Sequence, residues 1–240
     1  VEVTFTDGST GSYDLVVGSD GLYSDLRRRL FPDAPVPTFT GQAVWRYNLE
    51  RPADLEWGSV YFGHSTKVGL VPMTPTLMYM FVVTHEPDNP RFPPEELADL
   101  LRERLADYDG LIGELREKIV DPTGVVYRPM EHMLLPAPWH KGRAIVIGDG
   151  AHANTPHLNQ GAAMAIEDAV LLAELLGRDE PLSALFDEFM HRRFDRAKFV
   201  VETSDQLATW ELEEWAGTKP HDSRPGQLLG SATMKLLEAY

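Results

Sequence analysis

Residues 143–176 decide the fold and read RAIVIGDGAHANTPHLNQGAAMAIEDAVLLAELL. The apolar run at 144–147 predicts a buried strand, and residues 157–176 predict a helix that is apolar over most of its surface and therefore largely buried. Between them, Gly148-Asp149-Gly150 predicts a sharp turn whose carboxylate can accept hydrogen bonds from sugar-type hydroxyls. The helix start near Gly161 offers free backbone N–H groups, so the stretch is typical of a site for a nucleotide-like cofactor.

A second informative stretch, residues 14–27, reads DLVVGSDGLYSDLR. Residues 13–17 predict the return strand of a hairpin that begins at Val1, and we expect this strand to be buried in a mostly parallel sheet. Asp20-Gly21 follows at the carboxyl end of the strand, where open α/β sheets bind ligands. The same pair also fits a plain turn in which Asp20 caps the helix predicted over residues 22–31.

Both stretches resemble motifs of one family, the class A flavoprotein monooxygenases, which are aromatic hydroxylases with the p-hydroxybenzoate hydroxylase fold. Residues 14–27 resemble the Asp-Gly motif of that family. Four short segments together resemble the second flavin-binding motif of the family: Gly148–His152, Pro156-His157, Gln160-Gly161 and Glu167–Ala169. The resemblance implies FAD as cofactor, NADH or NADPH as co-substrate, and hydroxylation by O2 of an aromatic or similarly electron-rich small molecule.

The resemblance also implies where cofactor and substrate are contacted. Cofactor-binding positions are expected at Asp20, Gly21, Gly148, Asp149, Pro156, Gln160, Gly161, Ala162 and Ala163. Substrate contacts are expected at Arg46, Tyr61 and His157. For Arg46 the alternative is a guanidinium on the solvated face of an alternating strand. No residue is assigned as a catalytic acid or base.

A metal site is not expected. Asp149, His152 and His157 lie close together in the sequence, but their spacing matches no ligand pattern of a two-histidine, one-carboxylate iron site. The flavin motif already accounts for all three residues.

The predicted fold class is α/β (mixed α+β): part of a Rossmann-like FAD-binding domain, a β-sheet substrate domain and C-terminal helices. Domain boundaries are expected at 1–32 and 136–180 for the FAD-binding domain, 33–135 for the substrate domain and 181–240 for the helical region. Strands are predicted at 39–49, 59–62, 67–71, 77–84 and 125–135. In the long amphipathic helix or helix pair at 181–215, the charged residues, Arg193 among them, are expected to form a solvated face. A final helix is expected over 230–240.

The family begins with a strand, a G-x-G-x-x-G turn and a helix that hold the ADP half of FAD, and the chain contains no such motif. We therefore expect it to correspond to the C-terminal portion of a flavin monooxygenase. Its predicted central strands would then lack neighbours, which predicts a partner for the chain: the N-terminal half, a second chain or a homo-oligomer. The alternative is a non-catalytic substrate-binding or scaffolding module that needs another polypeptide.

Composition limits the partners, the cysteine chemistry and the cellular location that are expected for the chain. The formal net charge of -15 disfavours nucleic acid and anionic membrane as partners. The chain has no cysteine and therefore no disulfide or thiolate metal site. No apolar run reaches the ~18 residues that a membrane-spanning helix needs, and a cytoplasmic location is expected.

Overall fold

The apolar run before the glycine turn forms β10 (Ala144–Val146), and all three of its residues are buried. It is the central strand of a three-stranded sheet in the order β3-β10-β9. β3 (Val16–Gly18) pairs with it in parallel and β9 (His140–Lys141) in antiparallel orientation. The expected parallel neighbour of the first motif strand is thus β10, but the expected burial of that strand is wrong at Val17, which is exposed.

The computed structural model describes residues 1–238 and divides into two units. Unit 1 comprises residues 1–38, residues 131–208 and the segment from Arg224 onward, whereas unit 2 comprises residues 39–130 and 209–223. The mixed α/β class predicted from the sequence is confirmed. The assignment of cofactor and substrate roles to domains stays a prediction.

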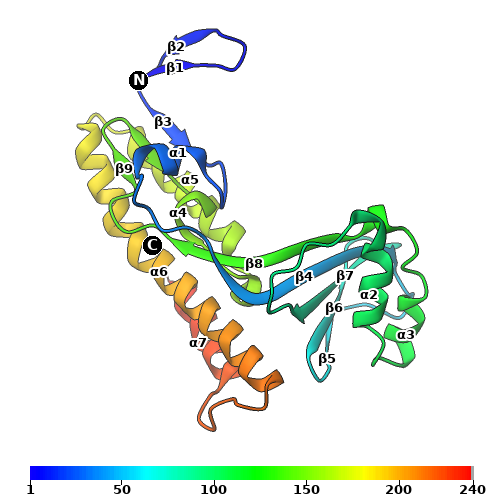
Figure 1. Cartoon of the computed structure of the whole chain (residues 1–240). Helices are drawn as coiled ribbons and strands as arrows, with labels where there is room; N and C mark the ends of the chain where they lie inside the picture. Colours follow the sequence, from blue (N-terminus) through cyan, green and yellow to red (C-terminus); the bar gives the residue numbers. More distant parts are fainter. Residues whose placement is uncertain (239–240) are drawn as a thin grey trace. The chain divides into compact units, whose positions relative to one another are not determined.

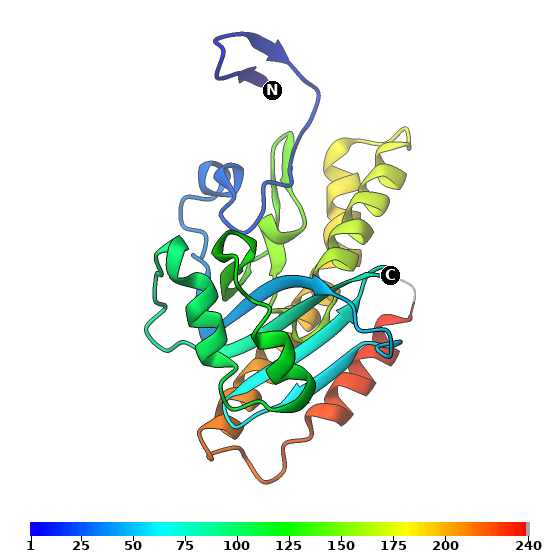
Figure 2. The same ribbon diagram turned by 90° about the vertical axis from the view of Figure 1, so that its right-hand side faces the viewer.

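Unit 1 combines its small sheet with several helices (Figures 1 and 2). Its elements beyond the sheet are α1 (Asp25–Leu30), α4 (Asp149–His152), η3 (Pro156–Leu158), α5 (Gly161–Leu176), α7 (Pro225–Leu236) and most of α6 (Leu182–Trp215). The region predicted as a helix or a helix pair is thus one continuous helix, α6. The last helix begins earlier than predicted, and residues 239–240 of the predicted segment lie outside the described residues.

The first hairpin differs from its prediction. β1 (Glu2–Thr4) pairs with β2 (Thr10–Ser12), so the return strand is not residues 13–17. The ammonium group of Val1 and the carbonyl of Tyr13 close the open end of this two-stranded sheet. β3 then starts separately and joins β10, where Gly18 is buried and Val16 is half-buried.

Unit 2 is built on a five-stranded sheet in the order β5-β6-β7-β4-β8 (Figure 1). The strands are β4 (Thr38–Glu50), β5 (Ser59–Phe62), β6 (Thr66–Pro72), β7 (Leu77–His85) and β8 (Val126–Leu134), close to the predicted ranges; β8 continues into unit 1. The helical elements of the unit are η1 (Pro94–Glu96), α2 (Leu97–Arg104), α3 (Gly110–Arg116) and η2 (Pro122–Gly124).

One face of this sheet carries the core of unit 2. Alternate residues of β4, Trp45 and Tyr47, pack with Leu101 of α2 and Ile112 of α3. Arg104 stacks its guanidinium over the Trp45 ring, at 4.5 Å from the centroid. Because side chains of a strand alternate between faces, the intervening residues of β4 emerge on the opposite face.

The surface of α5 was expected to be largely buried, and this expectation is wrong. Only one stripe of the helix, which includes Leu171 and Leu175, is buried. Ile166 and Val170 are exposed by 63% and 53%. No element among residues 1–238 covers this second apolar stripe, which also contains Ala162, Ala163, Ala169 and Ala173.

Within the same range, no helix combines the length and apolar character required to cross a bilayer.

The two stripes of α5 predict contrasting effects of truncation. We expect Leu171→Ala, at a fully buried position, to lower the free energy of unfolding by about 2–5 kcal/mol. Ile166→Ala removes exposed methyl groups and should change it by less than about 0.5 kcal/mol. Urea denaturation of both variants measures the contrast, and equal losses would mean that the exposed stripe is covered in solution.

Candidate functional site

The turn after β10 has a backbone conformation that suits glycine. Gly148 lies at φ +60° and ψ −145°, and a Cβ there would approach the Cβ of Ala165 to 3.3 Å. A Cβ at Gly150 would come within 2.7 Å of Val146. These two glycines let the chain turn sharply from β10 into the single turn of α4, with Asp149 as its first residue.

Asp149 has an exposed side chain at this turn. Among residues 1–238, no donor lies within hydrogen-bond distance of its carboxylate. The predicted strand-end carboxylate is therefore available as an acceptor for hydroxyl groups of a ligand.

Asp20 is engaged within its own motif. Its carboxylate accepts hydrogen bonds from the Ser24 hydroxyl (2.5 Å) and the Leu26 backbone N–H (3.1 Å). Burial acts to raise the pKa of Asp20, but these bonds more than offset it, so the pKa lies below its usual value. The side chain thus takes the capping role that the sequence left open, together with Ser24: Ser24 is the N-cap residue of α1, and Asp20 holds its hydroxyl and accepts a further N–H of the first turn, while Gly21, at φ +81°, shapes the turn.

Arg27 joins the two motifs, which the sequence analysis did not foresee. Only 2% of this residue is exposed. Its guanidinium donates to the carbonyl of Gly150 (2.7 Å) and to that of Leu22 (2.6 Å). A buried guanidinium from the first motif therefore binds the backbone of the second.

Asp168 is the centre of a buried network in unit 1. Its Oδ2 accepts the backbone N–H of Gly148 (2.8 Å) and lies 2.6 Å from Nε2 of His152. Its Oδ1 accepts from Nε of Arg193 (2.7 Å). Asp168 and Arg193 are both fully buried, so the solvated face predicted for α6 is wrong at Arg193.

The neighbouring acid extends this network. The Glu167 carboxylate accepts hydrogen bonds from Nε and Nη2 of Arg196, each at 2.8 Å, and also forms an ion pair with Arg193. Burial raises the pKa of Asp168, but His152 and Arg193 more than offset it, and the pKa lies below its usual value. The interleaved charges of α6 concealed these pairs in the sequence, because their partners are on another helix.

The start of α5 lies close in sequence to the remaining predicted cofactor residues. Pro156 begins η3, and Asn159 adopts the left-handed conformation at φ 55° before the helix starts. Gln160 is the N-cap residue, but its side chain makes no capping bond. The small residues Gly161 to Ala163 leave the helix start accessible, and such a start can receive an anionic or polar ring edge. A free carboxylate at one turn and an uncapped helix start both suit a flavin.

His157 is half-buried beside this helix start. Its Nδ1 lies 2.9 Å from the hydroxyl of Thr155, which itself donates to the carbonyl of Ser204. Within residues 1–238, no group of three histidine or acidic side chains is placed to share a metal ion.

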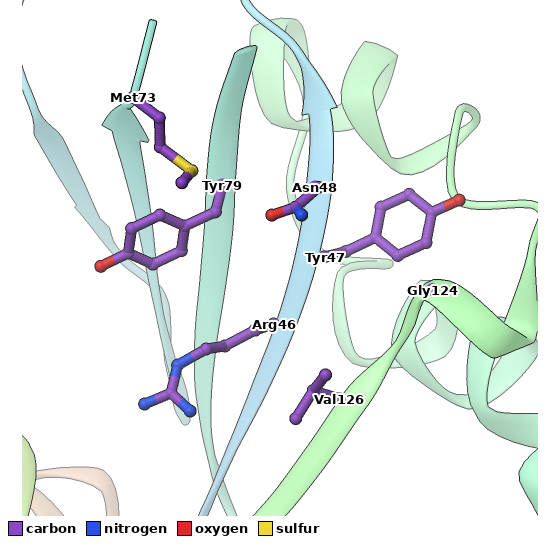
Figure 3. A pocket seen from close by; sticks show the side chains of 7 residues that line it. All are labelled: Arg46, Tyr47, Asn48, Met73, Tyr79, Gly124 and Val126. Atoms are coloured by element: carbon purple, nitrogen blue, oxygen red, sulfur yellow. The ribbon is translucent and has the colours of Figure 1, made fainter.

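Unit 2 has a shallow pocket on the sheet face that α2 and α3 do not cover. Arg46 and Asn48 of β4 line it with Tyr79 of β7, and Asn48 is the register partner of Tyr79. Figure 3 shows Arg46 and Tyr79 on one side of β4 and Tyr47 on the other. The pocket has a volume of ≈ 240 Å³, and its remaining lining residues are Tyr47, Met73, Gly124 and Val126.

Three polar groups in this pocket are available for a ligand. Among the described residues, the guanidinium of Arg46, the amide of Asn48 and the hydroxyl of Tyr79 have no hydrogen-bond partner. Asn48 and Tyr79 were missed in the sequence analysis, although strand alternation from Arg46 indicates Asn48.

Tyr61 lies elsewhere in unit 2. Its side chain packs against the core cluster that contains Trp45, Leu70 and Leu101. The structure therefore does not bring Tyr61 together with Arg46, and its contact with substrate stays a prediction that this packing does not support.

The comparison with protein families gives the class of the protein. Residues 1–204 match the family described as FAD binding domain, and the chain belongs to this family. It is 35% identical over 219 residues to 2-heptyl-3-hydroxy-4(1H)-quinolone synthase of Pseudomonas aeruginosa, covering 87% of this chain and 56% of that protein. It is 31% identical to aurachin C monooxygenase/isomerase of Stigmatella aurantiaca, covering 87% and 55%. The resemblance to flavin monooxygenases is confirmed, and the chain spans about half the length of these relatives.

A solved structure supports the fold. The chain aligns with Klebsiella pneumoniae HpxO complexed with FAD and uric acid at a TM-score of 0.83 and 22% sequence identity, over 98% of this chain and 63% of that one. At this level of identity the similarity shows the fold alone.

The Asp168 network predicts an acid-dependent contribution to stability. The pKa of Asp168 is lower in the folded state than in the unfolded chain, where it is about 3.9. The ionised carboxylate therefore stabilises the fold above that value, and the contribution is lost as pH falls through the folded pKa. We expect Asp168→Asn to cost about 3 kcal/mol at pH 7, because the buried Arg193 loses its fully buried partner and keeps only the half-buried Glu167.

Urea denaturation between pH 3 and pH 8 measures this dependence. The difference in unfolding free energy between wild type and Asp168→Asn should be constant at neutral pH and shrink below about pH 4. Asp179→Asn, at an exposed position outside the network, is the control. A difference that does not change with pH would contradict the prediction.

Proposed function

We propose that the polypeptide carrying this chain is an FAD-dependent monooxygenase. It uses NADH or NADPH and O2 to hydroxylate an aromatic or similarly electron-rich small molecule, and it acts in the cytoplasm. The observation that carries this proposal is the Asp149 carboxylate, which has no partner among the described residues and stands on a glycine turn whose backbone is bound by residues of both flavin motifs.

The cofactor role is assigned to residues of unit 1. Asp149 accepts hydrogen bonds from hydroxyl groups of the ribityl chain, and the start of α5 at Gly161 stabilises negative charge at the flavin edge. Asp20 and Gly21 contribute near the diphosphate through the shape of their turn, since the Asp20 carboxylate already caps α1. FAD, when bound, supplies the hydride acceptor and the activation of O2.

The substrate role is assigned to the open sheet face of unit 2. Arg46, whose guanidinium has no partner among residues 1–238, binds an electron-rich oxygen of the substrate. The ring of Phe81 lies over Gly69, where a Cβ would come within 2.0 Å of it, and adds an aromatic surface to the same face. His157 of unit 1 remains a further candidate for substrate contact.

A second candidate function is a module that works only with another polypeptide. The exposed apolar stripe of α5 and the free edge of β3 favour it, because such surfaces are usually covered. The covering partner is an N-terminal half, a second chain or a further copy of this chain.

An FAD titration of the complete polypeptide tests the proposed function. We expect saturable binding, followed by flavin fluorescence and visible absorbance. Asp149→Ala should weaken the binding by about 10- to 100-fold, because hydrogen bonds to a charged group are lost. Asp179→Ala is the exposed control. A wild-type protein that binds no FAD under any condition would refute the proposal and leave the module function.

The role of Arg46 is tested with the aromatic compound that most strongly stimulates NAD(P)H oxidation. Arg46→Gln should raise KM by about 10-fold, through the loss of a charge-assisted bond, while FAD affinity stays unchanged. Arg128→Gln, an exposed residue of β8 in the same sheet, is the matched control. An unchanged KM for Arg46→Gln would mean that Arg46 does not contact the substrate and only occupies the solvated face of the sheet.

A further inference from the structure

Two buried charges of opposite sign hold the turn that carries Asp149. On one side, the Asp168 carboxylate accepts the backbone N–H of Gly148 (2.8 Å). On the other side, the Arg27 guanidinium donates to the backbone carbonyl of Gly150 (2.7 Å). Hydrogen bonds therefore fix the main chain of the three-residue turn immediately before and after Asp149.

Both charges are buried to a degree that needs compensation. Asp168 is fully buried and Arg27 is 2% exposed. Among the described residues, Arg27 makes no ion pair, and its hydrogen bonds go to backbone carbonyls. Burial lowers the pKa of this guanidinium, the sign of an unfavourable environment for its charge. A neutral apolar side chain would fill the same space at lower cost, so packing alone does not account for Arg27.

The partners of Asp168 fix its direction. His152 and Arg193 occupy its other acceptor positions, so the carboxylate is held against α6 and cannot rotate away from Gly148. The orientation of the turn is thereby set by α1 through Arg27, and by α5 and α6 through Asp168.

Asp149 itself takes no part in these contacts. Its side chain is exposed and free of partners within residues 1–238, while the main chain around it is fixed. A carboxylate on an unrestrained glycine turn would lose conformational freedom on binding a ligand, and fixing the turn beforehand removes that cost.

We propose that Arg27 and Asp168 are positioning residues that preorganise Asp149 for the ribityl chain of FAD. They act through the Gly150 carbonyl and the Gly148 N–H respectively, without touching the cofactor themselves. The inference rests on the proposed FAD-binding function and adds to it the residues that set the geometry of the Asp149 contact.

The test is a double-mutant cycle on FAD affinity in the complete polypeptide. Arg27→Met and Asp168→Asn should each raise the Kd for FAD by about 10- to 100-fold, the effect of a small misplacement of a binding group. In an Asp149→Ala background, the same two substitutions should raise the Kd by less than about 2-fold, because the group they position is absent. Arg27→Lys, which retains a donor and the charge, should recover part of the affinity.

Two controls separate positioning from stability. Leu185→Ala removes a buried side chain of α6 elsewhere in unit 1 and should lower the Tm of the apoprotein about as much as Arg27→Met, yet leave the Kd unchanged. Arg29→Gln replaces an exposed arginine of α1 and should change neither quantity.

The outcomes are distinguishable. If wild type binds FAD and Arg27→Met and Asp168→Asn bind it equally well, the positioning role is wrong and the proposed function stands. The inference would also be overturned if Arg27→Met and Asp168→Asn raised the Kd for FAD as much in the Asp149→Ala background as in wild type. The two residues would then affect FAD binding independently of Asp149. Absence of FAD binding by wild type would instead refute the proposed function.

Discussion

The hydrogen bonds of the buried Asp168 carboxylate are the constraint on which unit 1 depends. This one group binds a backbone N–H at the end of β10, an imidazole in α4 and a guanidinium in α6. An ionised carboxylate is tolerated inside a protein only when its acceptor positions are satisfied. The four elements that meet at Asp168 therefore stabilise one another, and loss of one partner leaves a buried charge uncompensated.

A different constraint organises unit 2. The two-residue period of its strands sends Trp45 and Tyr47 into the core beneath α2 and α3, and sends Arg46 and Asn48 to the other face. The Trp45 indole donates to Thr84 and carries the Arg104 guanidinium over its ring, so the polar groups on the covered face are used within the fold. On the open face Arg46 keeps its hydrogen-bonding capacity and lines the pocket.

Local pattern was a reliable guide where a residue and its environment are close in sequence. The strands of unit 2, the buried strand at 144–146 and the turn at Gly148 all follow from alternation, apolar runs and glycine placement. Burial of Arg193 and exposure of Ile166 did not follow, because each depends on which distant element packs against one side of a helix. The interleaved acids of α6 indicated a solvated surface, yet the acids that pair with Arg193 belong to α5.

The sequence by itself determined the fold class, the two flavin motifs and their family, because turn geometry and strand period are properties of neighbouring residues. Only the tertiary structure decided that Arg27 reaches Gly150 and that Asp168 reaches Gly148, across 123 and 20 positions of the chain. It also decided that Asp20 caps a helix whereas Asp149 stays free. The physical reason is that the state of a charged side chain depends on which partners the fold brings within hydrogen-bond distance, and motif spacing does not encode that distance.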